Sequence, residues 1–506
     1  MNKRASGILL HITSLPSRFG IGDMGPESRR FADFLSETRQ SYWQVLPINP
    51  TDMTFGNSPY SGPSSYAGNP ILISPEIMKD AGYLSAADIN MKTFPKPERV
   101  DYGLVTVSKT ALFHRAFRNA ESSLPGDSGF KEFSKENGHW LDDYALYASV
   151  KKNLPGTWRD FPADLRDRDE KSLEAWREKA AREIIYHKFL QYIFFRQWDS
   201  LKKYANERGV EIIGDIPYYI NYDSSEVWSN PEFFKLDKDK NPEYVSGVPP
   251  DYFSKTGQLW GNPVYDWEAL KETGFEWWIR RIGHNLKLFD SLRLDHFRGF
   301  VSYWEVKAGE RTALNGRWVG LDAVSFFDTL FSHFDKSRFI AEDLGYITPD
   351  VKKIIKKYDL PGMKILLFAF GDDFPYGSYL PKNFSNKNCV VYTGTHDNNT
   401  VIGWWEKDAG SAEKERFFKY IEYIGSEMDY SDLSWEFIRL AMSSAADTAI
   451  IPVQDVMGLG ADAKMNRPST KSGNWEWRLT PGYYQEDLVA KLKEITESSN
   501  RGELSG

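Results

Sequence analysis

Short apolar runs, each followed by polar residues, recur along the whole chain. Each run spans six to eight residues and is rich in Val, Ile and Leu. An apolar run without polar alternation is typical of a strand buried on both faces, as in a parallel sheet. The pattern therefore predicts eight strands, at residues 7–12, 42–48, 210–217, 291–297, 338–343, 362–368, 388–395 and 448–455.

Stretches with apolar residues at helical spacing separate many of these runs. Pro26 can open a helix that places Phe31 and Leu35 on one face, and similar stripes cover 275–286 and 348–358. Eight alternations of strand and helix favour a closed barrel over an open sheet. The fold class predicted is therefore α/β, a (β/α)8 TIM barrel.

Two connections are too long for ordinary barrel loops. Residues 50–180, after the second strand, hold several helical patterns and predict a mainly helical insertion subdomain. Residues 218–274, after the third strand, form an insertion rich in Pro, Asn, Gly and aromatic residues. Because barrel active sites lie at the C-terminal ends of the strands, both insertions are expected to wall that face. The whole chain, 1–506, is expected to be a single catalytic barrel.

The composition excludes several classes of function and cellular location. The 506 residues carry a net charge of −8, which argues against nucleic acid as the main partner. No apolar run reaches the ~18 residues of a membrane span. A single cysteine, Cys389, excludes an intrachain disulfide, and no signal peptide is evident, so a cytoplasmic protein is expected. The aromatic share is high, at 15%, and suits stacking on the flat faces of sugars as well as core packing.

Two local motifs are misleading. Residues 20–25 match G-x-G-x-x-G, but the preceding strand is too distant and no acidic residue follows the next strand to hold a ribose. Residues 237–242 begin like a calcium-binding loop, but Pro242 stands where that loop needs glycine. Neither a dinucleotide nor calcium is therefore expected.

Four carboxylates lie at or just after the ends of predicted strands: Asp215, Asp295, Glu342 and Asp397. Any one of them could cap the following helix or pair with an arginine. Together at one barrel mouth, they would repel unless one stays protonated, which is the pKa separation that a two-carboxylate glycosidase uses. Arg293 and Asp295 share a face of their strand, so the arginine can keep that aspartate ionised.

The sequence strings around these acids are more specific. RLD at 293–295, Glu342 and HD at 396–397 resemble conserved regions of the α-amylase superfamily. Longer strings resemble the 4-α-glucanotransferases, or amylomaltases, among them SPYSGPSSYAGNP, GVPPDYFSKTGQLWGNPVYDW, YTGTHDNNT and DVMGLGADAKMNRP. These strings span nearly the whole chain. The resemblance implies a barrel with insertions, no metal or organic cofactor, and disproportionation of α-1,4-glucans with retained anomeric configuration.

Carried over by position, the resemblance implies that Asp295 is the nucleophile, Glu342 the general acid and then base, and Asp397 a transition-state stabiliser. The residues implied to bind substrate are Tyr60, Asp215, Asp251, Gln258, Trp260, Arg293, His396 and Asn466. Among the insertion aromatics, the candidates for stacking on sugar are Tyr60, Trp228, Tyr252, Phe253 and Trp260. The Asn-His that follows the first conserved acid in α-amylases is absent, since Asp215 begins the string DIPYYIN.

The expected substrates are maltodextrins and other α-1,4-glucans, as donor and acceptor, with glucose as a further acceptor. No nucleic acid, membrane or obligate protein partner is expected. Two alternatives stay open: an α-1,4-glucan hydrolase that uses the same acids, and a non-catalytic glucan-binding protein. The second would be expected to lose at least one acid, whereas all three catalytic positions are intact.

Overall fold

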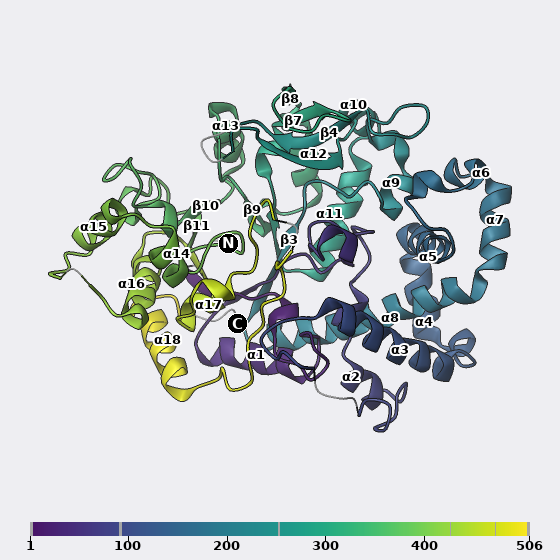
Figure 1. Ribbon diagram of the computed structural model, residues 1–506, viewed down its shortest axis with the longest axis horizontal. Coiled ribbons are helices and arrows are strands. Elements are labelled where there is room, and N and C mark those ends of the chain that lie inside the picture. Colours follow the sequence, from purple (N-terminus) through teal and green to yellow (C-terminus); the bar gives the residue numbers. More distant parts are fainter. Residues whose placement is uncertain (1–3, 91–93, 251–253, 426, 471, 503–506) are drawn as a thin grey trace.

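The computed structural model describes residues 4–90, 94–250, 254–425, 427–470 and 472–502 (Figure 1). At its centre eight parallel strands form one sheet, in the order β10-β11-β12-β1-β2-β3-β6-β9. Each of them overlaps one predicted run, so the parallel sheet is confirmed. The strands are β1 (Ala5–Leu9), β2 (Tyr42–Gln44), β3 (Glu211–Ile216), β6 (Ser291–Leu294), β9 (Phe339–Ala341), β10 (Gly362–Ile365), β11 (Cys389–Tyr392) and β12 (Thr448–Pro452).

The outer strands of this ladder, β9 and β10, approach each other and nearly close the sheet. The backbone N–H of Ala341 donates to the carbonyl oxygen of Pro361, just before β10, at 2.9 Å. The N–H of Met363 donates to the Asp343 carboxylate at 2.7 Å. With helices packed around the strands, the architecture is the (β/α)8 barrel that the alternation predicts.

Amphipathic helices cover the outside of the barrel. Helix α1 (Pro26–Glu37) begins at its proline and buries Phe31, and the ring of Phe31 meets Trp43 of β2 edge-on at 5.0 Å. Helix α13 likewise begins at Pro349. The other helices outside the long connections are α11 (Glu276–Leu288), α12 (Ala323–His333), α13 (Pro349–Tyr358), α14 (Val401–Lys407), α15 (Ser411–Tyr420), α16 (Tyr430–Ser443), α17 (Val453–Val456) and α18 (Glu486–Ser498).

The connection after β2 contains a group of helices on the right of Figure 1. Buried Lys109 on α3 joins this group to the segment between β1 and α1, because its ammonium contacts Asp23 at 3.2 Å. It also donates to the carbonyls of Ile71 and Ile73, within the same connection, at 2.7 and 3.0 Å. The helices are α2 (Pro75–Asp80), α3 (Tyr102–Ala120), α4 (Ser128–Glu136), α5 (Gly138–Asn153), α6 (Ala163–Arg166), α7 (Glu170–Lys179) and α8 (Ala181–Asn206), which leads into β3.

A second, antiparallel sheet was not predicted from the sequence. It lies at the top of Figure 1 and has the strand order β5-β4-β7-β8. Two strands belong to the connection after β3, which also holds α9 (Ser225–Ser229) and α10 (Trp267–Glu272), and two follow β6. The sheet thus joins the aromatic-rich insertion to the segment that follows β6. Its members are β4 (Tyr244–Val248), β5 (Gln258–Pro263), β7 (Ser302–Lys307) and β8 (Gly316–Gly320).

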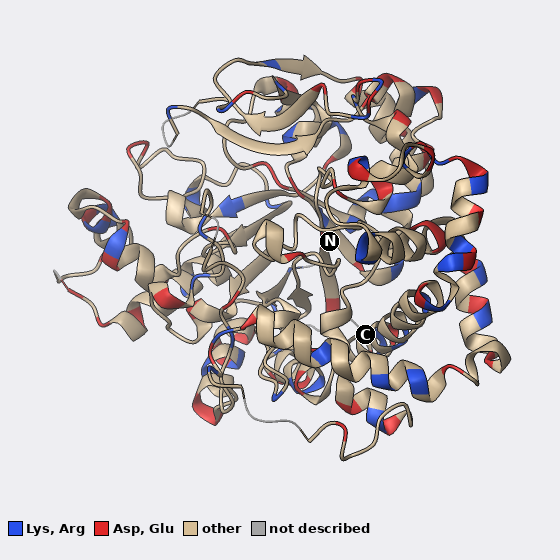
Figure 2. Cartoon of the chain, turned by 45° about the vertical axis from the view of Figure 1, so that its right-hand side comes forward, with Lys and Arg blue, Asp and Glu red and all other residues tan. Residues whose placement is uncertain are grey.

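Charges of both signs are interspersed along the outer helices, as Figure 2 shows. Across the described ranges, no helix is both long and apolar enough to span a bilayer.

Candidate active site at the barrel mouth

The sheet delivers four carboxylates to one end of the barrel. Asp215 is the penultimate residue of β3, Asp295 directly follows β6, and Glu342 directly follows β9. Asp397 lies in the loop after β11. Because all these strands are parallel, their carboxyl ends meet at the same mouth, where barrel enzymes place their chemistry.

Arg293 links two of these acids. Its Nη1 atom donates to both carboxylate oxygens of Asp215, at 2.8 and 2.7 Å, and to Oδ1 of Asp295 at 3.0 Å. The phenol of Tyr60 donates to Asp215 Oδ2 at 2.7 Å. Burial by itself lowers the pKa of Arg293, but Asp215 and Asp295 raise it well above its ordinary value. The arginine therefore stays charged and holds Asp295, whose side chain is 27% exposed, at the mouth.

Backbone donors hold Glu342 beside Asp295. The N–H of His296 donates to Glu342 Oε2 at 2.7 Å, and the N–H of Leu344 donates to Oε1 at 2.9 Å. Burial raises the pKa of Glu342 to about 8; the Arg293 charge opposes this shift and the Asp295 charge adds to it. At neutral pH this carboxyl is therefore protonated, as proton donation to a leaving group requires.

Asp397 is more open, with 48% of its side chain exposed. Its Oδ1 accepts a hydrogen bond from Asn466 Nδ2 at 2.7 Å, and its Oδ2 lies 3.6 Å from His396 Nε2. The His396 ring stacks on Tyr60 at 5.3 Å between centroids. Since Tyr60 also reaches Asp215, hydrogen bonds and ring stacking connect the third acid to the arginine-held pair.

The strand β5 brings Gln258 and Trp260 to the same site. The indole N–H of Trp260 donates to Gln258 Oε1 at 3.3 Å, and the indole ring meets His296 edge-on at 4.9 Å. Trp260 is 39% exposed, so part of its ring is open to a ligand. Of the remaining candidates, Asp251, Tyr252 and Phe253 lie outside the described residues.

One aromatic candidate for sugar stacking is wrong. Trp228 on α9 is fully buried, where the guanidinium of Arg168 covers its ring at 4.5 Å and its N–H donates to the Leu165 carbonyl. An indole closed in this way has no free face for a sugar ring. Composition alone could not separate this core tryptophan from the half-exposed Trp260.

Other groups beside the acids were not singled out from the sequence. Burial raises the pKa of Asp343 to about 6. The Asp343 carboxylate accepts a hydrogen bond from the Met363 N–H on β10. Burial, with smaller contributions from Asp343 and Glu342, raises the pKa of Tyr379 to about 12. The Tyr379 ring meets Phe368 edge-on at 5.6 Å, and Phe368 is 42% exposed. Asp343 is visible in the string IAEDLG, whereas no local pattern marks Tyr379.

The donor set does not suggest a metal site. Among the residues that the structure describes, no group of three or more His, Cys, Asp or Glu side chains is arranged to hold an ion. The acids at the mouth are instead bonded to arginine, tyrosine, asparagine and backbone N–H groups. Each carboxyl group is thus already positioned by the chain itself.

A barrel mouth with one arginine-held carboxylate beside one protonated carboxyl defines a class of protein: the enzymes that cleave glycosidic bonds with two carboxyl groups. Comparison with known sequences makes this more specific. The chain belongs to the 4-alpha-glucanotransferase family, whose sequence profile matches residues 10–484. The resemblance drawn from the motifs is therefore confirmed.

Individual relatives match over almost their full length. The 4-alpha-glucanotransferase of Aquifex aeolicus is 47% identical over 490 residues, covering 97% of this chain and 98% of that protein. That of Thermus thermophilus is 44% identical, covering 98% and 99%. The solved amylomaltase of Streptococcus agalactiae, in complex with acarbose, superposes with a TM-score of 0.94 at 38% identity, covering 99% of this chain and 100% of that one.

Proposed function

We propose that this 4-alpha-glucanotransferase moves a segment of a 1,4-α-glucan to the 4-hydroxyl of an acceptor glucan or glucose by double displacement. The observation that carries the mechanism is the contrast between two neighbouring carboxyl groups. Asp295 is bonded to the Arg293 guanidinium, whereas burial holds the pKa of Glu342 at about 8. One is suited to attack and the other to donate a proton.

In the first half-reaction, Asp295 attacks the anomeric carbon while the Glu342 carboxyl protonates the departing glycosidic oxygen. Because Oδ1 of Asp295 accepts from Arg293, we assign the attack to Oδ2. The glycosidic C–O bond breaks, an ester bond forms between the sugar and Asp295, and Glu342 becomes a carboxylate. In the second half-reaction, Glu342 removes the proton of the acceptor hydroxyl, whose oxygen displaces Asp295. Two inversions retain the configuration.

The remaining groups are assigned to substrate binding. Asp397, Asn466 and His396 form one polar group beside the stacked ring of Tyr60, suited to sugar hydroxyls. Gln258 and Trp260 border the site from β5, and we propose Asp251 as a further contact. Maltodextrins are the proposed donors and acceptors. With one cysteine, the chain needs no oxidising compartment, and we propose that it works in the cytoplasm.

The domain organisation follows from the same assignment. We propose one catalytic unit, 1–506, with 50–180 as a helical subdomain and 218–274 as a wall of the active site. The pairing of β4 with β7 supports this role for 218–274, because β7 closely follows Asp295 in the chain.

Incubation with maltotriose alone tests the proposal directly. Transfer produces glucose together with a ladder of longer glucans, whereas hydrolysis produces only glucose and maltose. Products separated by chromatography at early times distinguish the two. A mixture without any glucan longer than maltotriose would favour the hydrolase alternative.

The pH dependence follows from Glu342. Because its pKa is raised to about 8, the group is protonated below that value and loses its proton as the pH rises through it. We expect kcat/KM for maltotriose to fall across pH 8, by about tenfold for each further pH unit. A glycosyl fluoride, whose leaving group needs little protonation, is the control and should show a much weaker alkaline decline. Equal declines for both donors would contradict the assignment.

Substitution of Asp397 should separate transition-state binding from ground-state binding. Its hydrogen bonds to sugar hydroxyls are expected to strengthen as positive charge develops at the anomeric carbon. Asp397→Asn should therefore lower kcat by about 10²–10³-fold, with a much smaller change in KM. Asp462→Asn, at an exposed carboxylate in a neighbouring segment, is the control. A change in KM alone would make Asp397 a simple substrate contact.

Trp260 should affect the choice between transfer and hydrolysis. Water at about 55 M competes with the acceptor, so transfer needs an acceptor that is held and aligned. The turn before β5, which positions Trp260, is restricted to glycine at residue 257. Gly257 has a φ of 67°, and an added Cβ there would lie 2.4 Å from the Val248 carbonyl oxygen. Trp260→Ala should raise the ratio of hydrolysis to transfer up to about tenfold by removing a stacking face. If both rates fall together and the ratio is constant, Trp260 serves the donor instead.

A further inference from the structure

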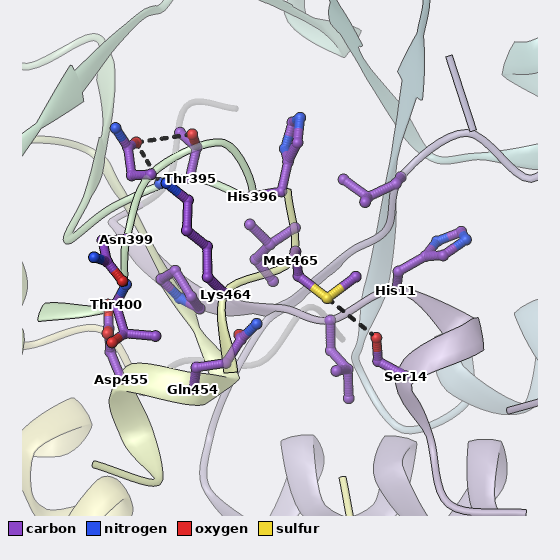
Figure 3. A pocket seen from close by; sticks show the side chains of 15 residues that line it. His11, Ser14, Thr395, His396, Asn399, Thr400, Gln454, Asp455, Lys464 and Met465 are labelled. Carbon is purple, nitrogen blue, oxygen red and sulfur yellow. Dashed lines mark hydrogen bonds between the residues drawn. The ribbon is translucent and has the colours of Figure 1, made fainter. Parts of the chain in front are cut away.

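The short helix α17 follows β12 at the barrel mouth, and two adjacent residues on it are buried: Gln454 is 6% exposed and Asp455 is 1% exposed. Figure 3 shows that both line a pocket together with Thr395 and His396 from the loop after β11 and Met465 from a later segment. The mechanism proposed above uses neither Gln454 nor Asp455.

Asp455 holds both ends of the loop that carries Asp397. The hydroxyl of Thr393, where β11 has just ended, donates to Asp455 Oδ2. The N–H of Val401, where α14 begins, donates to Oδ1 at 2.8 Å. One carboxylate therefore closes residues 393–401 into a fixed loop.

Inside this loop, local hydrogen bonds fix the position of Asp397 relative to the two ends that Asp455 holds. The N–H and hydroxyl of Thr395 both donate to Asn398 Oδ1 at 2.9 Å. The N–H of Asp397 contacts the Thr395 hydroxyl oxygen at 3.3 Å. The turn 395–398 is thus closed on itself, and its orientation depends on where the two ends of the loop are held.

Gln454 holds a second segment, which contacts Asp397 through Asn466. Its Nε2 atom donates to the Ala463 carbonyl at 3.2 Å. Three residues later, the Asn466 side chain donates to Asp397 Oδ1 at 2.7 Å, and its backbone N–H donates to the His396 carbonyl at 3.1 Å. Neighbouring residues of α17 therefore hold the two segments that meet at Asp397.

Helix α17 is itself firmly held. The Ser434 hydroxyl on α16 donates to the backbone carbonyl of Asp455 at 2.6 Å, and Val453 and Val456 are buried. A buried carboxylate is costly, and burial raises the pKa of Asp455 to about 6. Its donors, the Val401 N–H and the Thr393 hydroxyl, offset part of that cost.

We propose that Asp455 is a positioning residue for Asp397, acting through the 393–401 loop while Gln454 orients the Asn466 segment. The inference rests on the proposed role of Asp397 in stabilising the transition state. Asp397 is half-exposed and contributes through short hydrogen bonds, so a displacement of its loop by ~1 Å would cost about 10²-fold in rate. The two hydrogen bonds that Asp455 accepts from Thr393 and Val401, called the clamp below, keep the loop in place before the sugar binds.

A double-mutant cycle on kcat for maltotriose tests the inference. Asp455→Ala removes both loop contacts and should lower kcat by about 10–100-fold per active site, with a smaller change in KM. Asp455→Asn can still accept from Val401 and donate to Thr393 Oγ, so it should recover most of that loss. Ser434→Ala weakens α17 without touching the clamp and should change kcat by less than about twofold.

The decisive comparison is made in the Asp397→Asn background. If Asp455 acts through Asp397, Asp455→Ala should lower the residual kcat by less than about threefold further. Independent, multiplying losses would overturn the inference but leave the proposed function intact. An Asp397→Asn enzyme with nearly unchanged kcat would overturn both the inference and the proposed role of Asp397 in stabilising the transition state, whereas glucan transfer itself is tested separately by the products from maltotriose. If Asp455→Ala does not fold, Thr393→Val removes one clamp contact and enters the same cycle with a smaller loss expected.

Discussion

Asp295→Asn is expected to reduce glucan transfer by about 10⁴-fold or more while the barrel stays folded, because an amide cannot form the glycosyl ester. The fold should tolerate the change for a specific reason. Arg293 keeps two hydrogen bonds to Asp215 and can still donate to the amide oxygen at position 295. No buried charge is left without its partner, so the melting temperature should stay close to that of the wild type.

The measurement is the initial rate of glucose release from maltotriose, with the melting temperature recorded beside it. Asp290→Asn is a matched control at the other end of the same strand, where the Asp290 side chain accepts from the Ile212 N–H at 2.8 Å. It should lower stability slightly and leave the rate per folded enzyme unchanged. Ladder formation by the Asp295 variant near the wild-type rate would show that another group attacks the anomeric carbon.

Glu342→Gln should nearly abolish turnover of ordinary glucans, by about 10³-fold or more, because both half-reactions of the proposed mechanism need its proton transfer. The amide oxygen can still accept from one of the His296 and Leu344 N–H groups, which bond to different oxygens of Glu342, and the other N–H loses its acceptor. The barrel should therefore stay folded, with a small loss of stability. With a glycosyl fluoride the first step no longer needs an acid. The second step still lacks a base, so the glycosyl-enzyme should accumulate.

Mass spectrometry of the intact variant after brief incubation with the fluoride detects that ester, and peptide mapping should place it on Asp295. The double variant Asp295→Asn, Glu342→Gln supplies the control and should carry no adduct. If Glu342→Gln loses activity equally on the fluoride and on maltotriose and traps no ester, Glu342 is not the proton donor.

The eight strands could be predicted because each is encoded by its own short apolar run. The structure ends several strands earlier than the runs: β2 stops at Gln44, although the run continues to residue 48. Apolar residues beyond the last ladder hydrogen bond are still buried at the mouth, so hydrophobicity marks burial there rather than strand pairing. The second sheet escaped prediction because three of its strands, β4, β5 and β8, are partly exposed and carry no continuous apolar run, and because β4 pairs with β7 from a distant segment.

The candidate site was predictable to the extent that it is local. The contact between Arg293 and Asp295 follows from their spacing of two residues in a strand, and the structure shows it at 3.0 Å. The bond from Arg293 to Asp215, 78 residues earlier, depends instead on β3 and β6 being neighbours in the sheet. Those two residues stand directly opposite in that pairing.

By itself, the sequence determined the strand and helix repeat, the acids at the strand ends and, through its long motifs, the family. Only the tertiary structure decided which acid is protonated, because the pKa of Glu342 depends on burial and on charges from other strands. It also decided that Trp228 is core and that Asp455 holds the Asp397 loop. The physical reason is that periodicity and spacing act between neighbours along the chain, whereas desolvation and long-range hydrogen bonds arise only when the barrel closes.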